Sequence, residues 1–151
     1  MTTGAGWGGL ILRCVLGVIY VMHGYLAYMV LWPRGVAAYV LRLGFPFGLT
    51  EPLAWYLIVV HTVGGIMLIL GLATRVVALL NVPIMLCAIF VIHLPQGFFM
   101  KSVVDTTSSQ VVAVGYEFPL LVLGATLALA LMGGGAFALD LMFRRPPGRR
   151  R

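Results

Sequence analysis

The chain has 151 residues, of which 62% are hydrophobic, and it carries only 10 Lys and Arg against 4 Asp and Glu. A mean hydropathy of +1.07 excludes an ordinary soluble domain and indicates an integral membrane protein. At about 20 apolar residues per crossing, the chain has room for about four spans and no separate soluble catalytic domain. The net charge of +6 therefore relates to membrane orientation and not to nucleic acid binding.

Stretches free of charged residues locate the spans, because a charge at the bilayer centre costs at least about 2.5 kcal/mol. They predict helices near residues 9–31, 53–73, 76–93 and 116–133. The second and third helices are separated by so few residues that they must form a tight antiparallel hairpin. We expect one domain over residues 1–151, an all-α antiparallel bundle of four transmembrane helices.

The basic residues predict the orientation of the bundle. Seven of them, which are Arg13, Arg75, Arg144, Arg145, Arg149, Arg150 and Arg151, lie toward one side, and Arg34, Arg42 and Lys101 lie toward the other. The positive-inside rule then places both termini in the cytoplasm. We expect the basic cytoplasmic tail 144–151 to contact anionic lipid headgroups, and Arg75 to pair with Asp140 in a structural role.

Two longer connections lie on the outer side of the predicted bundle. Residues 35–43 are apolar enough to form a short interfacial helix before Gly44-Phe45-Pro46 ends it. Residues 101–110 contain a run of Ser and Thr, which predicts an irregular, exposed segment.

Ionisable residues inside spans are costly and are therefore candidate functional residues. His23 lies eight residues before the outer end of the first helix, and His61 lies eight after the outer end of the second. At 1.5 Å per residue both sit about 12 Å below the outer boundary. Gly64 and Gly65 follow His61 at i+3 and i+4, and small residues allow close helix packing, so His61 should face into the bundle.

A second polar group is predicted at the outer ends of the last two helices. Glu117 shares a helix face with Gly124 and Ala128, which predicts an inward direction and a pair with His93. Imidazole and carboxylate groups can bind a carbonyl or hydroxyl and move a proton. The candidate site residues are His23, His61, His93 and Glu117 for proton transfer or hydrogen bonding, with Tyr116 and Gln96 as further ligand-binding residues. The alternative is a set of interhelical hydrogen bonds that fixes helix order.

A metal site is the weaker interpretation of the same residues. Three histidines and one glutamate could complete a coordination sphere, but no helix carries the HxxxH or ExxH spacing. We therefore predict no metal.

Several short motifs together resemble the DoxX family. These are His23-Gly24, Gly64-Gly65 with the 71–75 turn, His93 followed by Gly97-Phe98-Phe99, and Gly115-Tyr116-Glu117. The resemblance extends from about residue 10 to Asp140. It implies a small four-helix membrane protein of bacteria or archaea that works with redox partners, since related DoxD-type proteins are membrane subunits of a thiosulfate:quinone oxidoreductase.

Carried over to this chain, the resemblance matches polar family positions at His23, Arg75, His93 and Glu117. Two positions depart from the family pattern. His61 stands where the family commonly has Glu, and Ala27 stands where it commonly has Lys.

Three functions remain open from the sequence. The first is a quinone-interacting subunit of a redox complex in the cytoplasmic membrane, active only as part of a quinone-linked oxidoreductase because the chain has no evident electron carrier. The second is a non-catalytic accessory subunit of a larger respiratory or photosynthetic complex. A transporter is less favoured, because four spans offer no paired broken helices or repeat.

Overall fold

The structure, a computed structural model, describes residues 4–104 and 111–142. Its longer helices are α1 (Gly4–Tyr25), α2 (Trp32–Arg42), α3 (Phe47–Leu70), α4 (Thr74–Cys87) and α5 (Glu117–Met132). Two π-helical stretches, η1 (Leu26–Val30) and η2 (Ala88–His93), extend α1 and α4, and short 3₁₀ turns follow at η3 (Leu94–Gln96) and η4 (Leu139–Leu141). The strands are β1 (Lys101–Val104) and β2 (Val111–Val114). The basic tail 144–151 lies outside the described residues.

Three helical segments are long and apolar enough to cross a membrane, and they are Gly4–Val30, Phe47–Leu70 and Thr74–Gln96. They correspond to the first three predicted helices, although the first begins five residues earlier and the second six. The fourth, α5, is apolar but has only 16 residues. At 1.5 Å per residue it is about 24 Å long, which is less than the roughly 30 Å hydrocarbon core of a bilayer.

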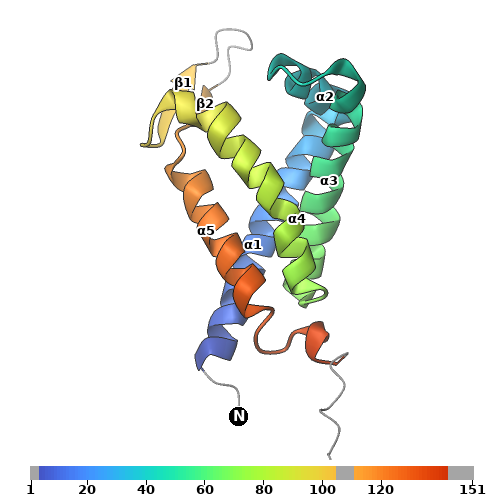
Figure 1. The fold of residues 1–151 in the computed structure, drawn as a ribbon, viewed down its shortest axis with the longest axis vertical. Helices are drawn as coiled ribbons and strands as arrows, with labels where there is room; N and C mark the ends of the chain where they lie inside the picture. Colours follow the sequence, from blue (N-terminus) through green and yellow to red (C-terminus); the bar gives the residue numbers. More distant parts are fainter. Residues whose placement is uncertain (1–3, 105–110, 143–151) are drawn as a thin grey trace, which may run out of the picture.

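The helices pack as two pairs that meet at one end of the molecule (Figure 1). α1 packs mainly against α3, and α4 packs mainly against α5. The start of α1, the α3–α4 turn and the end of α5 lie at the same end, while α2 and the two strands lie at the other. The end with α2 and the strands is called the α2 end below, and the opposite end is called the turn end.

Close contact between α1 and α3 depends on two glycines. A Cβ placed on Gly65 would lie 2.8 Å from the carbonyl oxygen of Gly17, and one on Gly17 would lie 2.7 Å from the carbonyl oxygen of Gly65. Both distances are too short for a methyl group, so the two backbones touch directly. The predicted small-residue contact beside His61 therefore joins α3 to α1.

The turn between α3 and α4 is fixed by one glycine and one carboxylate. Gly71 ends α3 with a φ of +70°, and the Leu72 amide donates to the Met67 carbonyl at 2.8 Å, a common way to end a helix. The Asp140 carboxylate accepts hydrogen bonds from the Ala73 and Thr74 amides at 2.6 and 3.0 Å. Asp140 thus stabilises the start of α4. Arg75 is exposed and lies beside Gly133, and its pairing with Asp140 stays a prediction.

Arg13, which was assigned to the same side as Arg75, lies near the α3–α4 turn as Arg75 does, but it is buried inside the protein. Its side chain is only 2% exposed and lies among α1, α3 and the segment after α5. The guanidinium donates to the carbonyl oxygens of Leu68, Ile69 and Ala136. Leu68 and Ile69 lie in the last turn of α3, where carbonyl groups lack helical partners and a cation is favoured.

Residues 101–104, which were expected to belong to an irregular segment of an all-α fold, form a strand instead. Lys101 pairs with Val114 and Val104 with Val111 in an antiparallel two-stranded sheet. Five of the eight strand residues are valines, and β-branched residues favour extended backbone. The Ser and Thr run lies at 106–109, outside the described residues.

The packed face of α5 also differs from the predicted one. A Cβ on Gly124 would meet nothing within 4 Å, and Gly124 is exposed. The buried residues of α5 are Pro119, Val122, Leu123, Thr126 and Leu129. The buried face of α5 is therefore a different one from the predicted face that carries Gly124.

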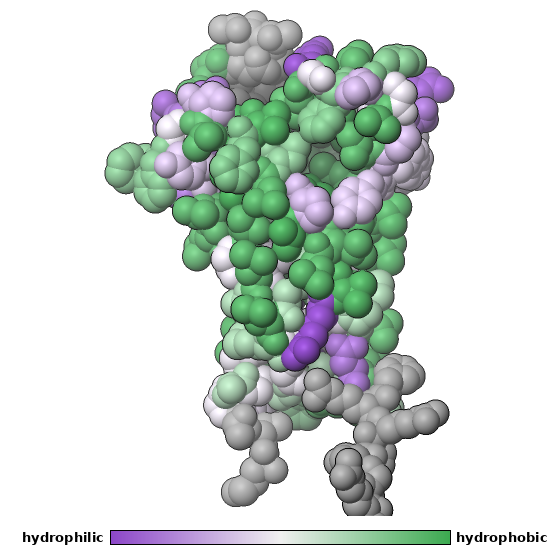
Figure 2. Space-filling model, viewed as in Figure 1, coloured by the Kyte–Doolittle hydropathy of each residue, from purple (hydrophilic) through white to green (hydrophobic). Residues whose placement is uncertain are grey.

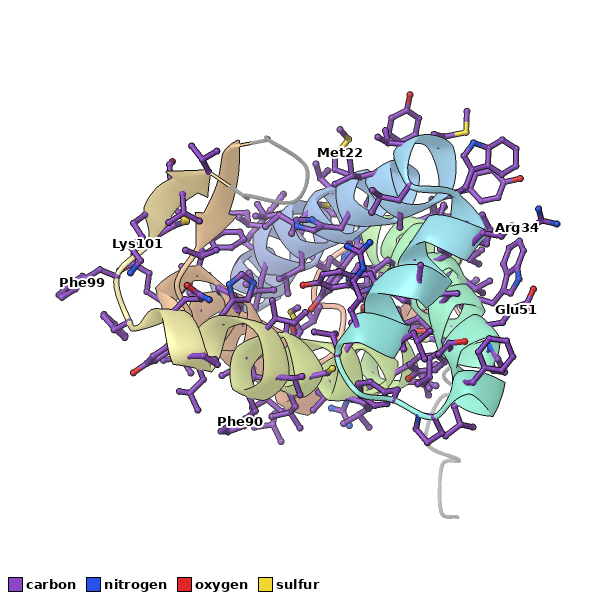
Figure 3. The ribbon with its side chains drawn as sticks, turned by 90° about the horizontal axis from the view of Figure 1, so that it is seen from above. Met22, Arg34, Glu51, Phe90, Phe99 and Lys101 are labelled. Atoms are coloured by element: carbon purple, nitrogen blue, oxygen red, sulfur yellow. The ribbon has the colours of Figure 1, made fainter. Side chains whose placement is uncertain are left out.

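The outer surface of the helices is apolar. Figure 2 shows hydrophobic residues over most of one face, with hydrophilic residues mainly toward the two ends. Met22 on α1 and Phe90 on η2 are 59% and 61% exposed and project outward from opposite sides of the molecule (Figure 3). Such a surface is stable in the hydrocarbon region of a lipid bilayer and not in water.

Candidate functional site

A cavity of about 840 Å³ lies between the two helix pairs toward the α2 end. Its walls come from α1, η1, α2, α3, α4, η2, the strand region and α5. Most of the lining side chains are apolar, among them Leu57, Ile84 and Phe118. The volume lies within the usual range for small-molecule sites, roughly 300 to 1,000 Å³.

Seven polar or reactive side chains interrupt this apolar lining. They are Tyr20, His23, Tyr39, Tyr56, His61, Cys87 and His93. All three histidines of the chain therefore face one cavity. This arrangement joins His93, which was expected in a separate group with Glu117, to the predicted pair of His23 and His61.

His61 lies deepest in the protein among the three histidines. Its side chain is 4% exposed, and its ring contacts the Tyr20 ring edge to face at a centroid distance of 4.9 Å. The His23 ring lies 6.4 Å away, centroid to centroid. His61 thus faces inward as expected, and Tyr20 restricts its orientation from the α1 side.

Two of the histidines carry an unpaired polar atom. Nδ1 of His61 and Nδ1 of His93 are both buried and have no hydrogen-bond partner among the described residues. A buried polar atom without a partner costs about 1 to 3 kcal/mol, and proteins rarely tolerate this without a functional reason. Both side chains also line the cavity, which makes it a candidate binding site.

Both π-helical stretches border the cavity. η1 contributes Leu26 and Ala27, and η2 contributes Ala88, Ile92 and His93. Single π-helical turns inside α-helices occur frequently at functional sites. Here they set which faces of the first and third spans meet the cavity.

The Tyr20 hydroxyl forms a hydrogen bond to α5. It shares a hydrogen bond with Thr126 Oγ1, and the Thr126 hydroxyl donates to the Val122 carbonyl at 2.7 Å. Because Thr126 already donates its one proton, Tyr20 is the donor of the bond between them. This buried bond links α1 to α5 next to His61, whose ring contacts the Tyr20 ring.

Two further tyrosines complete the polar lining. Tyr56 on α3 donates to the Leu80 carbonyl of α4 at 2.6 Å, close to Pro83, which interrupts the α4 hydrogen bonds. Partial burial raises the pKa of the Tyr39 hydroxyl on α2, and the neighbouring Cys87 adds to this shift. Tyr39 therefore remains a neutral hydrogen-bond donor.

The other three predicted site residues do not belong to the cavity lining among the described residues. The Glu117 carboxylate accepts a hydrogen bond from the Met100 amide at 2.9 Å rather than from His93. The Tyr116 amide donates to the Gly97 carbonyl at 3.2 Å, and Gln96 is exposed. Tyr116 and Glu117 thus hold residues 97–100 over the start of α5, and Met100 in turn lines the cavity.

Comparison with known proteins identifies the family. The DoxX family model matches residues 8–94, which is more than half of the chain. The chain belongs to the DoxX family. A protein of Bacillus subtilis (strain 168) named "Putative oxidoreductase CatD" is 28% identical over 133 residues, which cover 88% of this chain and 84% of the relative. No solved structure shows significant similarity to the chain.

The cavity histidines of this DoxX protein lie within the residues that the family model matches. His23, His61 and His93 all fall within residues 8–94, whereas Glu117 falls beyond it. Together with the apolar spanning helices, the family identifies a multi-pass membrane protein in a lipid bilayer.

Sequence reasoning did not find Tyr20 and Arg13. Tyr20 lies three residues before His23, so helical spacing alone places the two side chains on one face of α1. The 12 residues before Arg13 carry no charged side chain. A charge that follows such a run lies within the predicted span, which is the signal that it is buried and not at the surface.

Proposed function

We propose that this DoxX protein is a small subunit of a membrane redox complex and that it binds a quinone headgroup in its cavity. The observation that carries the proposal is the presence of three histidines in one apolar cavity. A quinone offers a flat conjugated ring and two carbonyl oxygens to such a site. Its hydrocarbon tail fits the apolar lining.

The cavity lies where a lipid-soluble molecule can reach it. It is enclosed by helices whose outer surfaces are apolar (Figure 2), including exposed residues such as Leu79, Phe90 and Val91 on α4 and η2. Because lipid tails are as apolar as this lining, the cavity admits a lipid-soluble ligand, and hydrogen bonds rather than hydrophobic transfer must hold it there. Quinones belong to this class of ligand.

The histidines supply hydrogen bonds and protons, and a partner subunit supplies or accepts the electrons. An imidazole nitrogen can donate or accept a hydrogen bond with a ligand oxygen and can transfer a proton along that bond. The relative named as an oxidoreductase supports a redox role. We further propose that α5 forms a fourth crossing of the cytoplasmic membrane and that both termini lie in the cytoplasm.

Quinone binding to the purified chain tests the proposal. Protein in lipid nanodiscs is titrated with decylubiquinone, and binding is followed by isothermal titration calorimetry. His61→Phe keeps a ring against Tyr20 but removes both nitrogens, so affinity should fall about tenfold or more, as expected for the loss of buried hydrogen bonds. Leu121→Ala on the outer face of α5, which is 69% exposed, is the matched control and should bind like the unchanged protein.

The same experiment distinguishes the accessory-subunit alternative. If the unchanged protein does not bind decylubiquinone, or if His61→Phe binds it equally well while remaining folded, the quinone proposal is wrong. Native mass spectrometry of the chain from its own membranes then shows whether it occurs only inside a larger complex, carrying lipid and no quinone.

A further inference from the structure

The hydrogen bond of His23 fixes which of its nitrogen atoms carries the proton. Nδ1 lies 2.9 Å from the carbonyl oxygen of Ile19 on the preceding turn of α1. A carbonyl oxygen only accepts hydrogen bonds, so Nδ1 is the donor. In the neutral imidazole the other nitrogen, Nε2, is then an acceptor. His23 therefore presents a lone pair, and not an N–H group, at the tip of its ring.

His61 offers the opposite hydrogen-bonding character. Its Nδ1 is buried without a partner, while the side chain lines the cavity, so the ring meets the cavity through its other edge. Placing the proton on Nε2 directs the donor toward a ligand and leaves only a lone pair unpaired. An unpaired buried acceptor is tolerated more often than an unpaired buried N–H group.

The spacing of the two rings leaves room for one ligand atom between them. Their centroids are 6.4 Å apart. A ring nitrogen lies about 1.1 Å from its ring centre, so even nitrogens that point at each other would be about 4 Å apart, beyond the roughly 3 Å of a direct hydrogen bond. An oxygen atom placed between the rings can bond to both. Tyr20 does not compete for this oxygen, because its hydroxyl donates to Thr126.

We infer that His23 and His61 together recognise a ligand hydroxyl, which donates to His23 and accepts from His61. A hydroxyl group has both functions, whereas a carbonyl oxygen would place its lone pair against the lone pair of His23. The inference rests on the proposed function and specifies it: the cavity binds the reduced dihydroxy form, the quinol, more tightly than the quinone.

Three probes with the same tail test this preference. Decylhydroquinone, decylbenzoquinone and the dimethyl ether of decylhydroquinone are titrated without oxygen into the nanodisc protein at about pH 8, where a free imidazole is neutral. The hydroquinone should bind about fivefold to tenfold more tightly than the other two, the effect of one added hydrogen bond and one relieved lone-pair contact. His23→Phe should abolish this ratio while decylbenzoquinone still binds.

Met22→Phe provides the matched control, because Met22 is the neighbouring residue on α1 and projects outward (Figure 3). It should leave the ratio unchanged. Equal affinities for the hydroquinone and its dimethyl ether in the unchanged protein would overturn the inference, even if the quinone binds. A ratio that survives His23→Phe would also overturn it. If none of the three probes binds, the proposed function fails and the inference fails with it.

Discussion

The Arg13 guanidinium donates a hydrogen bond to the Leu68 carbonyl at 3.2 Å, so a buried cation on α1 satisfies the backbone at the end of α3. The same guanidinium bonds to Ala136 beyond α5. One side chain therefore connects three parts of the chain that are far apart in sequence. Hydrogen bonds from Arg13 therefore join the helices at the turn end, whereas the cavity separates them toward the α2 end.

Replacing Arg13 should destabilise the protein strongly. Arg13→Met keeps most of the side-chain volume but leaves the three carbonyl groups without their donor, so we expect a loss of about 3 kcal/mol or more, since hydrogen bonds to charged groups contribute about 1.5 to 3 kcal/mol each. Thermal unfolding in detergent measures the loss. Arg75→Met, at an exposed arginine, should change stability by no more than about 0.5 kcal/mol. Equal effects of the two substitutions would contradict the role given to Arg13.

Two glycine substitutions should act in opposite directions. Gly65→Ala places a methyl group 2.8 Å from the Gly17 carbonyl oxygen and must separate α1 from α3, at a cost of about 1 to 3 kcal/mol. Gly124→Ala meets nothing within 4 Å and should stabilise α5 by about 0.5 to 1 kcal/mol. Unfolding temperatures of the two variants provide the comparison. A stabilised Gly65→Ala variant would show that the helices do not touch there.

Removing the Tyr20 hydroxyl should separate stability from ligand binding. Tyr20→Phe breaks the buried bond to Thr126 but keeps the ring against His61. We expect a stability loss of about 1 kcal/mol and an unchanged affinity for decylubiquinone. Thr126→Val removes the same bond from the α5 side and serves as the matched variant. A loss of quinone affinity in both variants would mean that the hydroxyl takes part in binding.

Glu117 should affect the loop and not the cavity chemistry. Glu117→Gln retains an oxygen that accepts from the Met100 amide, so decylubiquinone should bind as it does to the unchanged protein. Glu117→Ala removes the acceptor and should raise amide hydrogen exchange at Met100, because the amide loses its protein partner. If Glu117→Gln alone abolished binding, the carboxylate would contact the ligand directly.

The sequence predicted the long apolar helices and the shared depth of His23 and His61, because hydropathy and helical rise depend only on local residue counts. It could not predict that His93 faces the same cavity, since the π-helical turns of η1 and η2 shift the helical phase by an amount that residue spacing does not encode. The α5 face was assigned wrongly because small residues were assumed to pack inward. Large apolar residues face lipid and core equally well in a membrane protein, so pattern alone does not distinguish the two.

The position of the direct backbone contact between Gly17 and Gly65 has a mechanical consequence. The backbones of α1 and α3 touch there, and Arg13 closes the structure nearby at the turn end. Because the Arg13 guanidinium also bonds to Ala136 beyond α5, a small rotation between the two helix pairs about the turn end would change the separation of Arg13 and Ala136 very little. It would change the separation across the cavity much more, because displacement grows with distance from a pivot. Spectroscopic labels on α2 and β1 should therefore respond to an occupied cavity more strongly than labels at the α3–α4 turn.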